Sequence, residues 1–153
     1  MSKESLLSKV YEAYSALADQ RVKKESGSLY LVESSDHSKR YTVKIENDIY
    51  SSNDNATVWQ HYAGYPILAV WMIEGKVSYE KEVLPYFKDI NWKKLNTEAK
   101  NHYDIAIEKA FASQSEEVKK KIKEAVLKTA EEAKGLTFTI KGNRAKLLPP
   151  KEK

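Results

Sequence analysis

Seven consecutive apolar residues, Ile67 to Ile73, place the strongest constraint on how this chain can fold. A segment that is apolar on every side must be covered on every side, so it belongs near the centre of the molecule. Crossing a bilayer takes about 20 such residues, so we expect no membrane span and no membrane partner. Pro66 before the run and Gly75 after it fit the first turn and the end of a helix. We therefore predict a short buried helix over 66–73, with a buried strand as the alternative.

Alternation of apolar and polar residues predicts strands elsewhere in the chain. Residues 28–34 and 40–50 are separated by a polar break, and the second segment alternates from Arg40 to Glu46. This period of two predicts two antiparallel strands that each bury one face. The same alternation from Leu136 to Lys141 predicts a third strand.

Spacings of three and four residues predict helices in the remaining segments. The first helix carries a mostly apolar series at this spacing, whose last members are Leu17 and Arg21. We expect this helix to end near Gly27. Ser78, Asn91 and Ser115 can each cap a further helix, the last of which stops at Gly135. The predicted order is α-β-β-α-α-α-α-β. This is an α+β fold, in which four to five helices cover a small antiparallel or mixed sheet of about three strands.

The length of 153 residues predicts one domain over residues 1–142, followed by a flexible basic tail over 143–153. The absence of cysteine excludes thiol catalysis, cysteine-ligated zinc and iron–sulfur chemistry. No signal peptide is visible at the amino terminus, so we expect a cytoplasmic protein. The lack of cysteine, the three glutamines and the Lys/Glu-rich helices are compatible with a thermophilic source.

Motifs for cofactors and metals are missing from the sequence. Gly75-Lys76 is the only Gly-Lys pair, and Val70 and Val77 stand where a phosphate-binding P-loop requires Gly and Ser or Thr. No two of the three histidines have the four-residue spacing that would place them on one metal. We therefore expect no cofactor and no metal site.

One acid–base grouping can be assembled from His61, His102 and Asp104. An imidazole that titrates near neutral pH and is oriented by a carboxylate could serve a small hydrolase or transferase, if the two segments met in the fold. The alternative is that His61 packs among aromatic residues while His102 and Asp104 face water. On balance we expect a protein that is not an enzyme.

Ten of the 16 aromatic residues lie between Tyr50 and Tyr103. Aromatic side chains fill cores, but they also form interfaces and line ligand-binding grooves. Our leading hypothesis is a non-enzymatic protein-interaction or ligand-binding domain that uses this middle segment, with a protein partner or a second copy of the chain as the expected partner. The candidate binding residues are Trp59, Tyr62, Tyr65, Trp71 and Trp92.

The net charge of +4 is unevenly distributed along the chain. Residues 1–90 carry 11 basic and 13 acidic residues, whereas residues 91–153 carry 15 basic and 9 acidic residues. This asymmetry suggests an alternative function, non-specific nucleic-acid binding. Interleaved glutamates and the presence of only three arginines weaken that hypothesis. Its candidate residues are Lys119, Lys120, Lys123, Arg144 and Lys146.

Overall fold

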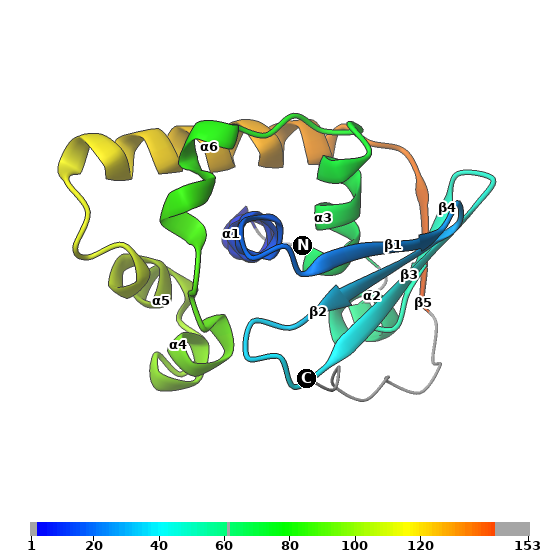
Figure 1. The fold of residues 1–153 in the computed structure, drawn as a ribbon, viewed down its shortest axis with the longest axis horizontal. Helices are drawn as coiled ribbons and strands as arrows, with labels where there is room; N and C mark the ends of the chain where they lie inside the picture. Colours follow the sequence, from blue (N-terminus) through cyan, green and yellow to red (C-terminus); the bar gives the residue numbers. More distant parts are fainter. Residues whose placement is uncertain (1–2, 61, 143–153) are drawn as a thin grey trace.

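The computed structural model describes residues 3–60 and 62–142. Within this part, a five-stranded sheet lies beside a group of helices in which α1 is central and α3 lies between α1 and the sheet (Figure 1). The elements in chain order are α1 (Lys3–Ala18), β1 (Val22–Ser26), β2 (Leu29–Glu33), β3 (Arg40–Glu46), β4 (Ile49–Ser52), α2 (Asn55–Gln60), α3 (Tyr65–Ile73), the 3-10 helix η1 (Lys81–Phe87), α4 (Trp92–Glu98), α5 (Tyr103–Ala110), α6 (Glu116–Lys134) and β5 (Thr139–Gly142).

The sheet is mixed, and its strands follow the order β1-β2-β3-β4-β5. The first four strands form an antiparallel meander, whereas β5 returns from the end of α6 to pair parallel with β4. The α+β class and the mixed sheet are therefore confirmed. The predicted count of about three strands is wrong, and the predicted four to five helices and their order do not match the seven helices of the described residues. The face of the sheet towards the helices buries Tyr30, Val32, Val43 and Tyr50.

Left-handed residues at two places in the backbone explain the additional strands. Gln20 has a φ of 55°, and the backbone N–H groups of Gln20 and Arg21 donate to the carbonyls of Leu17 and Ala16. These two bonds close α1 at Ala18, so the following residues are free to form β1 instead of extending the helix. Further on, Asn47 and Asp48 both have positive φ and form a tight hairpin turn that divides the predicted strand into β3 and β4.

The apolar run forms a helix, as predicted. All residues of α3 from Pro66 to Met72 are buried, because α1 covers one side and the sheet covers the other. Glu74 at the end of α3 accepts hydrogen bonds from the hydroxyls of Tyr30 and Tyr50, at 3.2 and 3.1 Å. The helix is thereby fixed to two strands of the sheet.

The helices before α6 differ from the prediction at three points. Ser78 does not cap a helix, because its backbone N–H and its hydroxyl both donate to the Glu132 carboxylate. The segment that follows is the 3-10 helix η1, with Pro85 inside it. The single helix expected after Asn91 is divided into α4 and α5, because Lys100 and Asn101 are left-handed, with φ of 53° and 64°.

Two predicted caps are confirmed. The Asn91 side chain accepts from Lys94 N at 3.0 Å, and the Ser115 hydroxyl accepts from Val118 N at 3.2 Å. Helix α2 was not predicted, because residues 57–73 show no hydrophobic period that would indicate a helix. None of the helices in the described part of the chain combines the length and apolarity needed to cross a bilayer. The predicted tail, residues 143–153, lies outside the described residues.

Candidate functional site

A polar cleft lies between α1, the sheet and the α4–α5 segment. It consists of two adjoining cavities of about 260 and 200 Å³, which we call together the Glu12 cleft. Helices α1, α3 and α4, strand β3 and the α4–α5 link each contribute to both cavities. The residues shared by both are Glu12, Tyr41, Tyr65, Asn96 and Asn101.

Glu12 is the acidic group at the centre of this cleft. Its Oε1 accepts a 3.0 Å hydrogen bond from Asn96 Nδ2. Burial raises the pKa of Glu12 from its ordinary value of 4.5 to about 7, although Lys9, the Asn96 hydrogen bond and Arg21 all act to lower it. Glu12 therefore changes its charge close to neutral pH.

The other end of the Asn96 amide has no partner. Asn96 Oδ1 is buried and accepts no hydrogen bond from any residue that the structure describes. Because Nδ2 donates to Glu12, Oδ1 is left as an acceptor inside the cleft.

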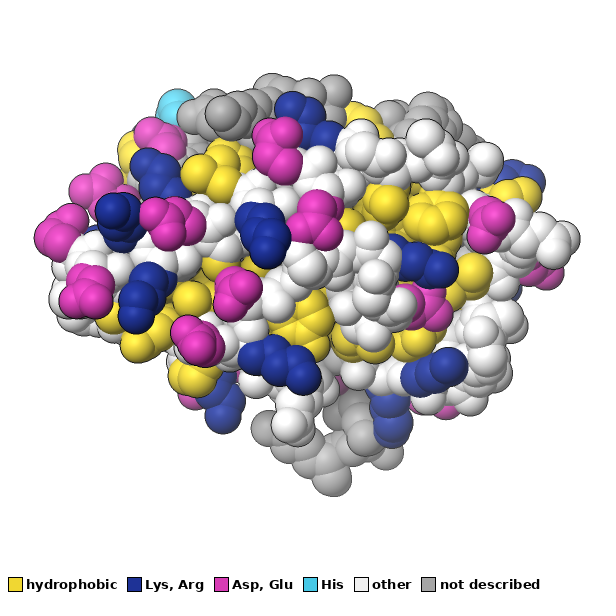
Figure 2. Space-filling model, turned by 90° about the horizontal axis from the view of Figure 1, so that it is seen from above, with side chains coloured by type: hydrophobic (Ala, Val, Ile, Leu, Met, Phe, Trp, Pro, Cys, Tyr) yellow, Lys and Arg dark blue, Asp and Glu magenta, His cyan; other side chains and the backbone are white. Residues whose placement is uncertain are grey.

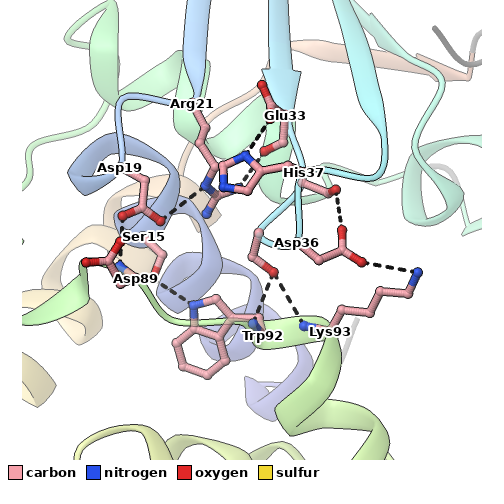
Figure 3. A network of polar contacts seen from close by, with 11 residues as sticks. Ser15, Asp19, Arg21, Glu33, Asp36, His37, Asp89, Trp92 and Lys93 are labelled. Carbon is pink, nitrogen blue, oxygen red and sulfur yellow. Dashed lines mark hydrogen bonds and ion pairs between the residues drawn. The ribbon is translucent and has the colours of Figure 1, made fainter. Parts of the chain in front are cut away.

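Arg21 supplies an unpaired donor on the sheet side of the larger cavity. The residue is only 5% exposed. Its Nε donates to Asp19 at 3.3 Å and its Nη1 to the Glu33 carbonyl at 2.5 Å (Figure 3). Its Nη2 has no hydrogen-bond partner among the described residues. Two other buried polar atoms are also unpaired, Thr42 Oγ1 and Trp71 Nε1, but their residues line neither cavity of the cleft.

Two tyrosines form an aromatic wall of the cleft. The rings of Tyr41 and Tyr65 meet edge to face, with centroids 6.0 Å apart. Burial, together with the negative charges of Asp54 and Glu12, raises the pKa of Tyr41 to about 12. Burial and Glu12 also raise the pKa of Tyr65 well above its usual value, and the Arg21 guanidinium opposes this shift. Both hydroxyls therefore stay protonated and can donate hydrogen bonds.

The smaller cavity contains one further pair of opposite charges, Lys9 and Asp54. Burial lowers the pKa of Lys9, whereas Glu12 and Asp54 act to raise it. Asp54 is 5% exposed and caps α2, because its carboxylate accepts from Thr57 N at 3.2 Å and from the Thr57 hydroxyl at 2.9 Å. The main role of Asp54 is therefore to hold the start of α2.

The loop between β2 and β3 forms the outer rim of the cleft. Asp36 accepts from the Ser34 hydroxyl at 2.8 Å and pairs with Lys93 at 3.4 Å, which ties this loop to the start of α4 (Figure 3). Burial alone would raise the pKa of Asp36, but the hydrogen bonds from Ser38, Ser34 and Lys93 outweigh it and lower the pKa. Trp92 at the start of α4 also joins this helix to α1, because its Nε1 donates to the Ser15 hydroxyl at 2.7 Å.

The predicted acid–base residues lie elsewhere. His102 and Asp104 are exposed at the start of α5, and neither lines the Glu12 cleft. His61 lies outside the described residues. Among the residues that are described, no group of three or more His, Cys, Asp or Glu side chains could hold a metal ion.

The predicted aromatic binding residues have different environments. Trp71 and Trp92 are each 3% exposed and belong to the core, although Trp92 also contributes to the cleft wall. Tyr65 lies in the cleft itself, and half-buried Tyr62 has the Lys9 ammonium 5.6 Å from its ring centroid. The side chain of Trp59 lies outside the described part of the structure.

The predicted nucleic-acid residues fall into two groups. Lys119, Lys120 and Lys123 lie on α6, where Lys119 is 3.5 Å from Glu116. On the upper face of the molecule, acidic and basic side chains alternate, with hydrophobic side chains between them (Figure 2). Arg144 and Lys146 lie outside the described residues.

Sequence reasoning missed most residues of the site, among them Glu12, Arg21, Tyr41, Asn96 and Asn101. One signal was present: Arg21 continues the apolar series of the first helix, where a charged residue is out of place. The others resemble ordinary surface residues of amphipathic elements. Only the meeting of α1, β3 and α4 distinguishes them.

The fold and the cleft define a mixed α+β protein with a polar, partly buried cleft between its helices and its sheet. The chain belongs to the family described as "Uncharacterised conserved protein UCP014422", whose model matches residues 2–139. The matched region contains every residue of the Glu12 cleft. Comparison with curated proteins gives no match. Comparison with solved structures also gives none.

Proposed function

We propose that this protein binds a small, neutral, polar molecule in the Glu12 cleft. The observation that supports the proposal most strongly is a pair of buried atoms that no described residue hydrogen-bonds, the donor Arg21 Nη2 and the acceptor Asn96 Oδ1. An unpaired buried polar group costs about 1–3 kcal/mol. Because both residues line the larger cavity, an occupant that accepts from one and donates to the other would offset both costs.

The cavities limit the size of this ligand. Pockets for drug-sized molecules begin at about 300 Å³. A ligand that occupies only one part of the cleft has less room than this, about 260 or 200 Å³. A molecule of the size of a single sugar, a nucleobase or a small amide is therefore the appropriate class.

The charges around the cleft favour a neutral ligand. The Arg21 guanidinium already pairs with Asp19, so an anion bound there would have to compete with an existing ion pair. The Glu12 and Asp54 carboxylates would also repel an anion. Adjacent acceptor and donor groups, as in an amide or a nucleobase, would complement Arg21 and Asn96 without adding charge.

This proposal retains the ligand-binding part of the hypothesis drawn from the aromatic segment. Two of its residues, Tyr65 and Trp92, line the larger cavity. The Tyr41 and Tyr65 rings would supply apolar contact for a flat ligand, while their hydroxyls add donors. Binding of this kind requires no metal or cofactor.

The test is a titration of the ¹⁵N-labelled protein, followed by NMR, with nicotinamide, uracil and glucose as neutral probes and with acetate and phosphate as anionic ones. We expect a neutral probe to shift the backbone signals of Glu12, Tyr65 and Asn96, and the anions to leave them unchanged. Asn96→Ala should weaken binding about tenfold, the equivalent of one hydrogen bond. Tyr86→Phe, a half-buried tyrosine outside both cavities, is the control.

Two results would reject the proposal. One is that no neutral probe shifts any signal of the cleft. The other is that Asn96→Ala binds the probe as well as the unchanged protein does, because the cleft would then contribute nothing to recognition.

The alternative, nucleic-acid binding, has weaker support. The α6 lysines are interleaved with glutamates, whose negative charges weaken the positive electrostatic potential of the helix surface. Titration with a short oligonucleotide at low salt tests it directly, since phosphate contacts are strongest there.

A further inference from the structure

An apolar cavity of about 310 Å³, separate from the Glu12 cleft, lies on another face of α1. Helices α5 and α6 both pack on α1 and enclose this cavity, which we call the α5–α6 groove. Its bottom consists of the buried residues Tyr11, Phe111 and Ile122. Leu7, Ile107 and Leu127 also line it but are only half-buried, so part of the apolar surface remains accessible to solvent.

The two edges of the groove carry opposite charges. Asp104 and Glu108 are one helical turn apart on α5, and Lys119 and Lys123 are one turn apart on α6. In the part of the chain that the structure describes, Asp104, Glu108 and Lys123 form no ion pair within 4 Å. Lys119 has only a 3.5 Å contact with the neighbouring Glu116. Both edges therefore offer charges to an external partner.

We propose that the α5–α6 groove is the interface through which two copies of this chain associate, with α5 of each copy lying against α6 of the other. In a two-fold symmetric dimer, every contact occurs twice. The acidic edge of one copy would then meet the basic edge of the other at both ends of the interface. This arrangement covers the half-buried apolar residues and pairs all four charges at once.

Other occupants satisfy fewer of these features. A small apolar ligand would fill the groove but leave Asp104, Glu108 and Lys123 without an ion-pair partner. An anionic membrane or nucleic acid would match Lys119 and Lys123 but would be repelled by Asp104 and Glu108. The 19-residue helix α6, about 28 Å long, has the length to contribute to an interface of the usual size, about 800 Å² on each partner.

The experiment uses two charge-reversed variants of the full chain. The first carries Lys119→Glu and Lys123→Glu on α6, and the second carries Asp104→Lys and Glu108→Lys on α5. Each alone brings like charges together at both ends of the dimer, so sedimentation velocity should show its dissociation constant raised at least about tenfold. Mixed in equal amounts, the two variants restore opposite charges at both ends, and we expect them to form a heterodimer about as tight as the original dimer.

The mixing step separates a lost interface from a lost fold, because a misfolded variant cannot be rescued by its counterpart. The matched control is Lys120→Glu with Lys128→Glu, which makes the same change in charge on α6 at two exposed positions outside the groove. This control should dimerise like the unchanged chain. An unchanged chain that stays monomeric over a wide concentration range would overturn the proposal. Two variants that fail to associate on mixing would also overturn it.

Discussion

Asn96 donates a 3.0 Å hydrogen bond through its side-chain amide to Glu12 Oε1, joining α4 to α1 across 84 positions of the sequence. An ionised carboxylate only accepts hydrogen bonds, whereas a protonated carboxyl can also donate one. The charge on Glu12 therefore decides whether this carboxyl can itself donate a hydrogen bond in the cleft. With Glu12 ionised, Nδ2 is engaged and Oδ1 remains the free acceptor.

The stability of the fold should depend on pH through Glu12. Its pKa is about 7 in the folded chain against an ordinary 4.5, so the folded state holds a proton that the unfolded state releases between these values. The contribution of Glu12 to stability is full below pH 4.5 and is lost as pH rises through 7. The difference amounts to about 3 kcal/mol.

Urea unfolding of Glu12→Gln at several pH values, compared with the unchanged chain, measures this effect. The variant should gain stability relative to the parent as pH rises from 4.5 to 8, because glutamine has no charge to bury. A constant difference between the two proteins over that range would contradict the prediction.

The pKa of Glu12 should rise when either of two neighbours is changed. Asn96→Ala removes a hydrogen bond that stabilises the ionised form, and Lys9→Met removes the positive charge that lowers the pKa of Glu12 most. A carbon-13 NMR titration of the Glu12 carboxyl measures both effects. Lys94→Gln, on the same helix as Asn96 but exposed, should leave the pKa unchanged.

Gly64→Ala should destabilise the protein by about 1–3 kcal/mol, the usual cost of overpacking. A Cβ at this position would lie 2.0 Å from Asp54 Oδ2, and Asp54 cannot move away without losing its cap of α2. Gly27→Ala is the matched control, because a Cβ there meets nothing within 4 Å. Denaturant unfolding of the two variants should separate them clearly. Equal stability would show that the Asp54 position can relax.

Tyr14→Phe should cost about 1–3 kcal/mol, because it leaves buried groups unpaired. The Tyr14 hydroxyl shares a 2.8 Å hydrogen bond with Thr129 Oγ1 and accepts from Glu80 N at 3.2 Å. It therefore connects α1 to α6 and to the segment before η1. Tyr79→Phe, a half-buried tyrosine outside this network, should change the unfolding midpoint little. Similar losses in both variants would mean that the hydroxyl network contributes nothing specific.

The parts of the fold that could be predicted share one property, in that each rests on neighbours in sequence. The helix over 66–73 was favoured by Pro66 and Gly75 at its two ends, and the caps at Asn91 and Ser115 follow from side chains three residues from the N–H groups they bind. The two helix ends at Gln20 and Lys100 were not predicted from the sequence. Neither residue is a glycine, so nothing in the pattern marked them as left-handed helix ends.

The candidate site could hardly be predicted at all. Glu12 and Asn96 each look like a polar residue on the outer face of an amphipathic helix, which is the commonest environment for such residues. Arg21 resembled a helix residue because the sequence did not reveal that α1 ends before it. The sequence suggested that the aromatic segment forms a binding region. Several of its aromatic side chains are instead buried in the core, and Tyr65 is its main contribution to the cleft.

The sequence by itself determined the α+β class, the burial of residues 67–73, the lack of cysteine chemistry and the charged surface of α6, because these depend on composition and local period. The tertiary structure alone decided where the polar cleft lies and that Glu12 has a pKa near neutrality. The physical reason is that burial depends on which elements meet. A carboxyl on a solvated helix ordinarily titrates near 4.5, and the packing of β3, α3 and α4 around Glu12 raises that value.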